Sequence, residues 1–248
     1  MIIFYDIPTK WSGVAWSPNT WKTRYALNYK GIPYKTEWVE FPDIEKHCIS
    51  LSIPTKDKKA DGSPYYSLPA IWDTDTGVKL SDSLEILKYL ETTYPNKPTL
   101  FPNNTQGVLT AFEGAFKGQL DALWEFILPA VSPAMNPRSE EYFTRTRTAS
   151  FGKPLADVVP TGAERKAKWA KYKADLDVVN EWYKATDNAG PWLLGDALSS
   201  GDLIVGGFTI WLKVLWGEDS EEWKDISSWN NGRWARIVGL LGQYSEVK

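Results

Sequence analysis

The sequence predicts a mixed α/β domain followed by an all-helical domain. Near the start, two short β-favouring runs at 2–5 and 33–39 enclose a helical segment, and a second strand pair precedes another helix. After residue 105 the alternation typical of strands stops and helical periodicity takes over. Between the two parts lies YPNKPTLFPNN, whose Pro and Asn content is typical of a linker. We therefore place the domains at residues 1–94 and 105–248.

Local signals predict the elements of the first domain. Ser17 suits the N-cap of a helix, Pro18 suits its first turn, and Gly31 suits the position just after its end. The other expected elements are strands at Ile2–Tyr5, Pro33–Val39, Leu68–Trp72 and Val78–Leu80, helices at Asp43–Ser50 and Ser81–Thr93, and a turn-rich surface loop within Leu51–Pro64.

The second domain is expected to contain only helices. Ser199 and Asp202 have the spacing of a capping box at the start of one of them, and Leu198 and Leu203 are placed for a hydrophobic staple. The expected helices are Thr105–Leu128, Ser139–Ser150, Gly162–Thr186, Asp202–Trp216 and Trp229–Tyr244.

Composition removes several classes of function. The net charge of -3 gives no electrostatic footprint for nucleic acid. With Cys48 as the single cysteine, an internal disulfide and a CxxC redox pair are excluded. With His47 as the single histidine, most zinc sites are excluded and a Ser-His-Asp triad is improbable. On a helix these neighbours point about 100° apart, so we expect neither to be catalytic and expect no metal. The N-terminus lacks the pattern of a secretory signal and no apolar run is long enough for a bilayer, so we expect a cytoplasmic protein that acts away from membranes.

Ser17 is the first candidate for chemistry. A helix N-terminus presents unpaired N–H groups and a partial positive charge, which stabilise a thiolate or a carboxylate. A serine hydroxyl at that position is able to donate a hydrogen bond to a bound thiolate. Asn19, in the same turn, is the second candidate. Simple capping of the helix by Ser17 explains the same pattern equally well.

Two further segments suit a peptide-like ligand. A proline is tolerated at a strand start, and a trans Leu68–Pro69 bond would be an ordinary strand start. We expect a cis bond, because that isomer would turn the Leu68 backbone outward to pair with an extended ligand. Asp82 and Ser83 lie at a helix start, where Ser83 suits a carboxylate and Asp82 suits an ammonium group. Capping of that helix is the other interpretation of the pair, and both interpretations are compatible.

The order of these motifs resembles the cytosolic glutathione transferases over essentially the whole chain. The stretch SPNTWKTRYALNYKG at 17–31 is similar to that of bacterial glutathione-dependent β-aryl etherases and of the fungal etherase-like FuA class. The resemblance implies a thioredoxin-like domain followed by an all-helical domain, glutathione as co-substrate, and a homodimer. One departure is the long loop Leu51–Tyr66, which we expect to reshape the glycyl end of the glutathione site or the entrance to the second site.

By this resemblance Ser17 replaces the catalytic Tyr, Ser or Cys of other classes. Leu68 and Pro69 would hold the cysteinyl backbone of glutathione, and Asp82 and Ser83 its γ-glutamyl end. The chain has 14 Trp, and flat rings favour aromatic partners such as wood or plant polyphenols. The residues expected to line this second site are Trp16, Trp21, Phe112, Phe116 and Trp124.

These expectations describe a glutathione transferase that acts on aromatic electrophiles or aryl ethers in detoxification. The alternative is a ligandin, a protein that carries aromatic polyphenols with negligible turnover. A third possibility is a structural adaptor that binds no glutathione at all. Activity with aromatic electrophiles separates the first from the second, and retention on immobilised glutathione tests the third.

Overall fold

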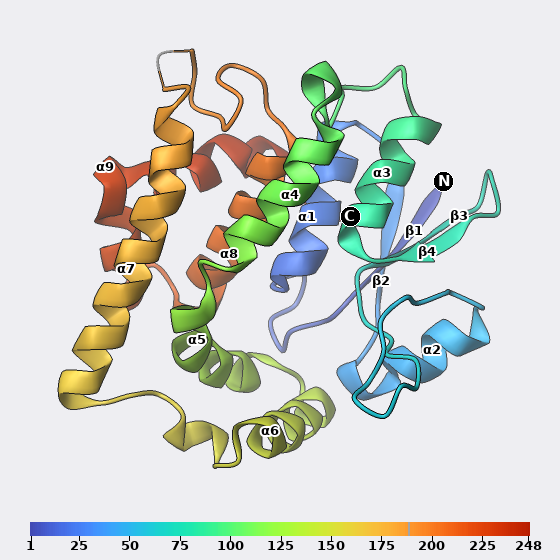
Figure 1. The fold of residues 1–248 in the computed structure, drawn as a ribbon. Coiled ribbons are helices and arrows are strands. Elements are labelled where there is room, and N and C mark those ends of the chain that lie inside the picture. Colours follow the sequence, from blue (N-terminus) through green and yellow to red (C-terminus); the bar gives the residue numbers. More distant parts are fainter. Residues whose placement is uncertain (188) are drawn as a thin grey trace.

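A computed structural model describes residues 1–187 and 189–248. The first part of the chain forms a four-stranded sheet in the order β2-β1-β3-β4 (Figure 1). Strands β1 and β2 run parallel, while β3 is antiparallel to both β1 and β4. The strands are β1 (Ile2–Asp6), β2 (Tyr34–Trp38), β3 (Ala70–Asp73) and β4 (Lys79–Ser81). The parallel pair requires a crossover, and the first helix supplies it.

Three helices accompany this sheet: α1 (Pro18–Tyr29), α2 (Ile44–Ser50) and α3 (Ser83–Thr93). Ser17 is the N-cap of helix α1, and Pro18 lies in its first turn. The chain leaves the helix at Gly31, where φ is +61°. That left-handed conformation is one that glycine adopts without steric cost. Helix α3 buries Ile86, Leu87 and Leu90, which form the apolar face of the helix.

In the described residues of the second part, the regular elements are all helices. Its helices are α4 (Gln106–Lys117), α5 (Trp124–Val131), α6 (Pro137–Phe151), α7 (Gly162–Lys184), α8 (Ser200–Trp216) and α9 (Glu221–Leu241). Short 3₁₀ turns join several of them. This arrangement confirms the predicted fold, a thioredoxin-like domain followed by an all-helical domain. In the described part of the chain, no helix has both the length and the apolar character that crossing a bilayer demands.

Two of the predicted helices differ from the observed ones by more than two residues at an end. The expected helix Thr105–Leu128 is two helices, because α4 ends at Lys117 and α5 begins at Trp124 after a 3₁₀ turn. The last helix starts at Glu221, capped by the Ser220 hydroxyl, which accepts a hydrogen bond from Trp223 N at 3.1 Å. Helical geometry is interrupted where the prediction placed its start, over residues 229–232.

Helix α8 is the buried centre of the molecule and joins its two parts (Figure 1). It packs against α1, and a Cβ on Gly207 would lie only 2.9 Å from the Pro18 carbonyl oxygen. Such a contact is closer than packed atoms tolerate, so the glycine allows the two helices to approach. Helix α8 therefore fixes where the N-terminus of α1 lies relative to the helical domain.

The start of α8 is held by the predicted cap. Asp202 is fully buried, and its Oδ2 accepts hydrogen bonds from the Ser199 amide and hydroxyl, both at 2.9 Å. Its Oδ1 accepts from the Leu193 amide at 2.8 Å. One carboxylate thus ties the preceding loop to the first turn of the central helix.

Candidate active site

The topology brings the sequence-predicted glutathione residues to one edge of the sheet. Because β3 is antiparallel to β1 and to β4, the end of β1, the start of β3 and the end of β4 lie at the same edge. Leu68–Pro69 precedes β3, Asp82–Ser83 follows β4, and the chain leaving β1 leads to Ser17. Ends of neighbouring strands in open α/β sheets are where ligands commonly bind.

Ser17 is the N-cap residue of α1, but its side chain makes no capping hydrogen bond. Its carbonyl oxygen accepts from Trp21 N at 3.0 Å and from the Thr20 hydroxyl at 3.1 Å. The residue is buried, with 5% of its surface exposed, and it borders a cavity. Capping by the hydroxyl therefore does not account for a serine at this position.

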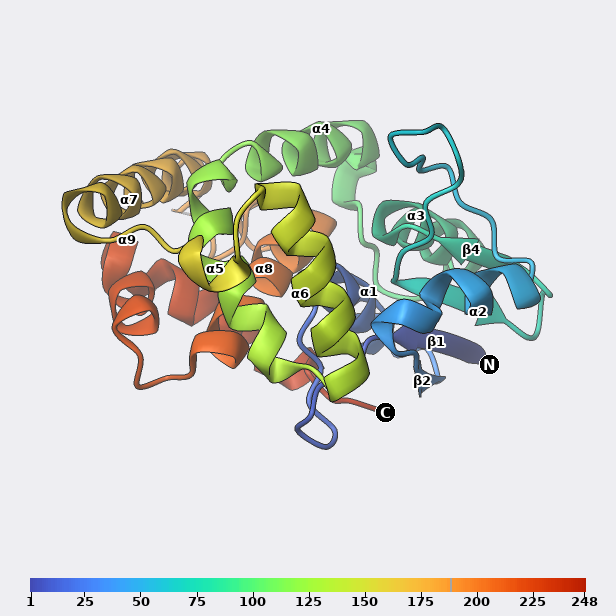
Figure 2. The ribbon, with the colours of Figure 1, turned by 90° about the horizontal axis from the view of Figure 1, so that it is seen from below.

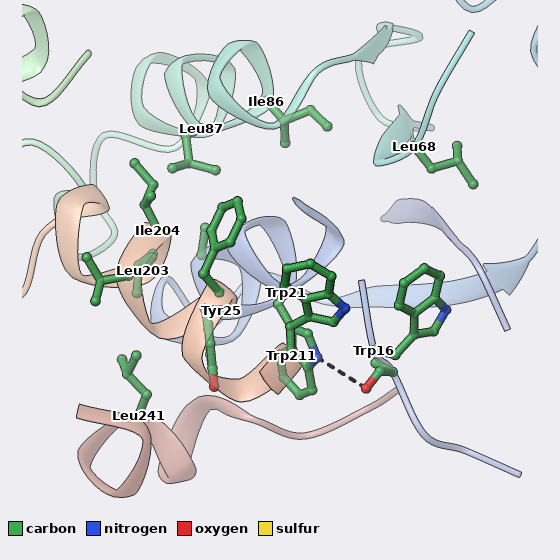
Figure 3. Packing of buried hydrophobic residues seen from close by; sticks show 14 of the residues in the cluster. Trp16, Trp21, Tyr25, Leu68, Ile86, Leu87, Leu203, Ile204, Trp211 and Leu241 are labelled. Carbon is green, nitrogen blue, oxygen red and sulfur yellow. Dashed lines mark hydrogen bonds between the residues drawn. The ribbon is translucent and has the colours of Figure 1, made fainter. Parts of the chain in front are cut away.

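The Leu68–Pro69 peptide bond is cis, as the sequence analysis expected. Both residues are buried at the start of β3. Leu68 borders the same cavity as Ser17, and Figure 3 shows its side chain on the strand side of the core, near Trp16.

Asp82 and Ser83 form the first turn of α3. The Asp82 carboxylate caps this helix, accepting hydrogen bonds from Leu84 N at 2.9 Å and Glu85 N at 3.1 Å. Asp82 has φ 76° and ψ 123°, a conformation that L-residues rarely adopt. Such residues cost about 1–3 kcal/mol and concentrate at ligand sites. Asp82 is exposed, whereas Ser83 is buried.

A cavity of ≈ 190 Å³ lies between the two domains beside Ser17. It brings together four of the expected site residues in addition to Ser17: Trp16, Asn19, Leu68 and Trp124. Asp82 borders a separate groove of larger volume, ≈ 580 Å³, along α3. Neither hollow is lined by Pro69 or Ser83. The expected glutathione residues thus share one edge of the sheet but not one pocket.

The other three expected aromatic residues do not line this cavity. The Trp21 indole N–H donates to the Ala15 carbonyl at 3.2 Å, and its ring packs on Tyr25 (Figure 3). Phe112 and Phe116 stack on each other and pack against α7 and α8, at Trp182 and Phe208. Helix α4 ends at Lys117 and Trp124 begins a separate helix. The α4 rings and Trp124 therefore do not share one helix face, and Trp124 can line the cavity while Phe112 and Phe116 do not.

Sequence reasoning missed several residues of the cavity wall. Figure 2 shows α6 lying between α5 and the segment that leads to α2. Residues from all these regions line the cavity. The missed residues are Ile7, Pro18, Phe41, Ile44, Tyr65, Tyr66, Ser67, Leu128, Val131, Phe143, Arg147, Phe208 and Trp211. The position of the long loop carried a signal, since we expected it to reshape a site entrance, and its end supplies Tyr65 and Tyr66.

The chemical inventory of this region is small. Burial raises the pKa of the Cys48 thiol to about 11, which keeps it protonated at neutral pH. Within residues 1–187 and 189–248, no three His, Cys, Asp or Glu side chains are grouped as metal ligands. Where α1 begins, the groups that border the cavity and are available to a ligand include the hydroxyl of Ser17 and the amide of Asn19, beside the unpaired N–H groups of the helix N-terminus.

Comparison with known proteins agrees with this architecture. Residues 16–93 match the model of the glutathione S-transferase N-terminal domain, and residues 108–244 match that of the C-terminal domain. A glutathione S-transferase-like protein of Aspergillus flavus is 34% identical over 98% of this chain and 92% of its own.

Solved structures of fungal proteins are similar to this structure over the whole chain. The glutathione S-transferase CsGST63524 of Ceriporiopsis subvermispora, solved in complex with glutathione, is 45% identical, with a TM-score of 0.94 over 100% of this chain and 98% of its own. Glutathione transferase GSTFuA3 of Phanerochaete chrysosporium is 39% identical, with a TM-score of 0.92 and the same coverage. The chain therefore belongs to the glutathione S-transferase family, and among its relatives of known structure is an enzyme of the fungal FuA type.

Proposed function

We propose that this glutathione transferase activates glutathione through Ser17 and transfers its sulfur to aromatic electrophiles. The observation that carries the proposal is that Ser17 borders the cavity while its side chain makes no capping hydrogen bond to its own helix. The hydroxyl is therefore available to a ligand. A free thiol with a pKa near 8.5 is mostly protonated at pH 7, and lowering that pKa by one unit requires about 1.4 kcal/mol. A hydroxyl donor together with the α1 N-terminus is able to supply this.

Glutathione would lie along the sheet edge, with its sulfur beside Ser17. The backbone of Leu68 would pair with the cysteinyl residue. Asp82 and Ser83 would bind the γ-glutamyl ammonium and carboxylate, consistent with the unusual conformation of Asp82. The glutathione-bound fungal relatives support this assignment at the level of the co-substrate.

The electrophile would occupy the cavity between the domains. Aromatic side chains from both domains wall it, among them Trp16, Trp124 and Trp211. Its ≈ 190 Å³ are close to a cavity of about 150 Å³ that takes one benzene ring. A two-ring phenolic compound would therefore place one ring inside and the other toward Tyr65, which is 39% exposed.

The reaction is a substitution at carbon. Glutathione loses its thiol proton to solvent, the thiolate forms a C–S bond with the ring or benzylic carbon, and the leaving group departs with its bonding electron pair. Holding both reactants in one cleft contributes as much as the lowered thiol pKa. An aryl ether with a phenolate leaving group is the etherase form of the same step.

Steady-state activity tests this proposal. We expect saturable turnover of glutathione with aromatic electrophiles, and strongly reduced turnover in Ser17→Ala. Tight binding of phenolic compounds without turnover of any electrophile would instead favour the ligandin function. We also expect a homodimer, which sedimentation measures.

A further inference from the structure

We propose that Arg147 makes the second site selective for aromatic electrophiles that carry an anionic group, such as a carboxylate or a phenolate. The inference rests on the proposed function, since it concerns the same cavity. It concerns the substrate class, and it assigns a specificity-determining role to a residue of the helical domain.

Helix α6 places Arg147 at the wall of the cavity. Ser139, Phe143 and Arg147 follow each other at intervals of four residues, so they lie on one face of the helix. The Ser139 hydroxyl oxygen accepts a hydrogen bond from the Phe41 amide at 2.8 Å, and the Phe143 ring lies 5.8 Å from the Phe41 ring. The first domain therefore packs against two successive turns of this face, and Arg147 borders the cavity on the next turn.

The guanidinium group of Arg147 is held in place by an aromatic ring. It lies 4.8 Å from the centroid of Phe143, a cation–π contact. The arginine is half-buried, so its aliphatic stem contributes to the apolar wall while the charged head stays at the cavity. A preorganised guanidinium loses less conformational entropy when it binds a ligand.

Arg147 has no carboxylate partner in the parts of the chain that the structure describes. The other two arginines of α6 both have one: Arg138 pairs with Asp43 at 2.9 Å and Arg145 with Glu141 at 3.2 Å. Near apolar walls, attraction between opposite charges is stronger than in water. A planar carboxylate on the ligand would match the fork of N–H donors on the guanidinium.

The glycyl carboxylate of glutathione is a second source of the same chemistry. We assign Arg147 to the aromatic ligand because it belongs to the helical domain and stacks on Phe143, one of the rings of the cavity wall. The expected glutathione residues all belong to the first domain. Kinetics with each substrate varied in turn separate the two sources.

The test compares two electrophiles that differ by one carboxylate, chlorodinitrobenzene and chlorodinitrobenzoate. In Arg147→Gln we expect kcat/KM for the benzoate to fall by about tenfold or more, the effect of one charge-assisted hydrogen-bond pair. The value for chlorodinitrobenzene and the KM for glutathione should change less than about twofold. Arg147→Lys should restore part of the loss, since it keeps the charge.

Arg145→Gln is the matched control, because it removes a charge from the same helix and its partner is a surface carboxylate. It should leave both electrophiles unaffected. An equal loss for both electrophiles in Arg147→Gln would reduce Arg147 to a packing residue, and a raised KM for glutathione would assign it to the glycyl end.

Binding of unreactive analogues keeps the test independent of turnover. Dinitrobenzoate should quench Trp fluorescence at lower concentration than dinitrobenzene does, and Arg147→Gln should abolish the difference. Failure of all turnover would overturn the proposed function alone. Equal binding of the two analogues to the unmodified protein would overturn the role of Arg147.

Discussion

Lys22 of α1 and Glu113 of α4 form a buried ion pair, with 2.8 Å between Nζ and Oε1, that joins the two domains. The Lys22 side chain is 1% exposed and the Glu113 side chain 6%. Burial alone would raise the pKa of Glu113, but Lys22 and Lys117 hold it below its usual value. Lys22 lies on the helix that Ser17 precedes as N-cap, so the pair helps to fix the position of the site between the domains.

Glu113→Gln should destabilise the protein by about 3 to 5 kcal/mol, because it leaves the Lys22 charge buried with no partner. Urea unfolding measures this loss. Glu141→Gln is the control, since its exposed pair with Arg145 should contribute less than about 0.5 kcal/mol. The double variant Lys22→Met with Glu113→Leu should recover most of the stability. A Glu113→Gln protein as stable as the control would contradict the role of the pair.

Asp202 should make stability depend on pH. Burial raises its pKa to about 6, against the hydrogen bonds from Leu193 and Ser199 that favour the charged form. A carboxyl group whose folded pKa is raised stabilises the folded state below the unfolded pKa, and this contribution is lost as pH rises through the folded pKa. The loss therefore falls between about pH 4 and pH 6 and amounts to roughly 3 kcal/mol.

Asp202→Asn isolates this contribution. The variant is less stable because the amide loses one acceptor oxygen at Ser199. The stability advantage of the unmodified protein over the variant should be larger near pH 4 than near pH 7. A constant advantage over that range would show that the pKa of Asp202 is unchanged by folding.

Asp82 combines a cap with an expected ligand contact, and two substitutions separate these roles. Asn caps helices as well as Asp and tolerates positive φ, so Asp82→Asn should keep its stability but weaken glutathione binding by about tenfold through the lost charge. Asp82→Ala should lose the same affinity and in addition about 1 kcal/mol of stability. Calorimetry measures the affinity, and thermal unfolding the stability. Normal glutathione affinity in Asp82→Asn would leave only the capping role.

Trp124 should contribute to binding of aromatic ligands. It borders the cavity and packs 5.9 Å from Trp211. A hydroxylated diphenyl compound should quench Trp fluorescence with micromolar affinity, about -8 kcal/mol, and compete with the electrophile more than with glutathione. Trp124→Leu should weaken this binding roughly tenfold. Trp182→Phe is the control, because Trp182 packs on Phe112 away from the cavity; an equal effect of both substitutions would place the ligand elsewhere.

The sequence predicted those features that depend on local signals. The α1 start at Ser17–Pro18 and the Ser199–Asp202 cap are each determined by residues within one turn. The left-handed run in α9 also had a local signal, Asn230-Asn231-Gly232 with φ of 53°, 56° and 75°. These residue types tolerate positive φ, and the prediction overlooked them.

The composition of the cavity wall could not be predicted in the same way. Arg147 looks in sequence like any surface arginine of α6, and its place at the cavity depends on contacts of α6 with the first domain, such as the packing of Phe41 on Phe143. Phe112 and Phe116 fit an apolar periodicity that suits a core or a site equally. The packing of separate helices decided between these, and periodicity within one helix carries no information about its neighbours.

The central claim is that the Ser17 hydroxyl stabilises the glutathione thiolate, and the thiol pKa of bound glutathione tests it most directly. Ultraviolet absorbance of the thiolate, titrated against pH in the saturated complex, measures this pKa. We expect a value below that of free glutathione for the unmodified protein and a value about one unit or more higher for Ser17→Ala, with turnover about 10- to 100-fold lower and glutathione affinity largely kept. The same thiol pKa in both proteins would contradict the account and shift the role to the α1 amides or to Asn19.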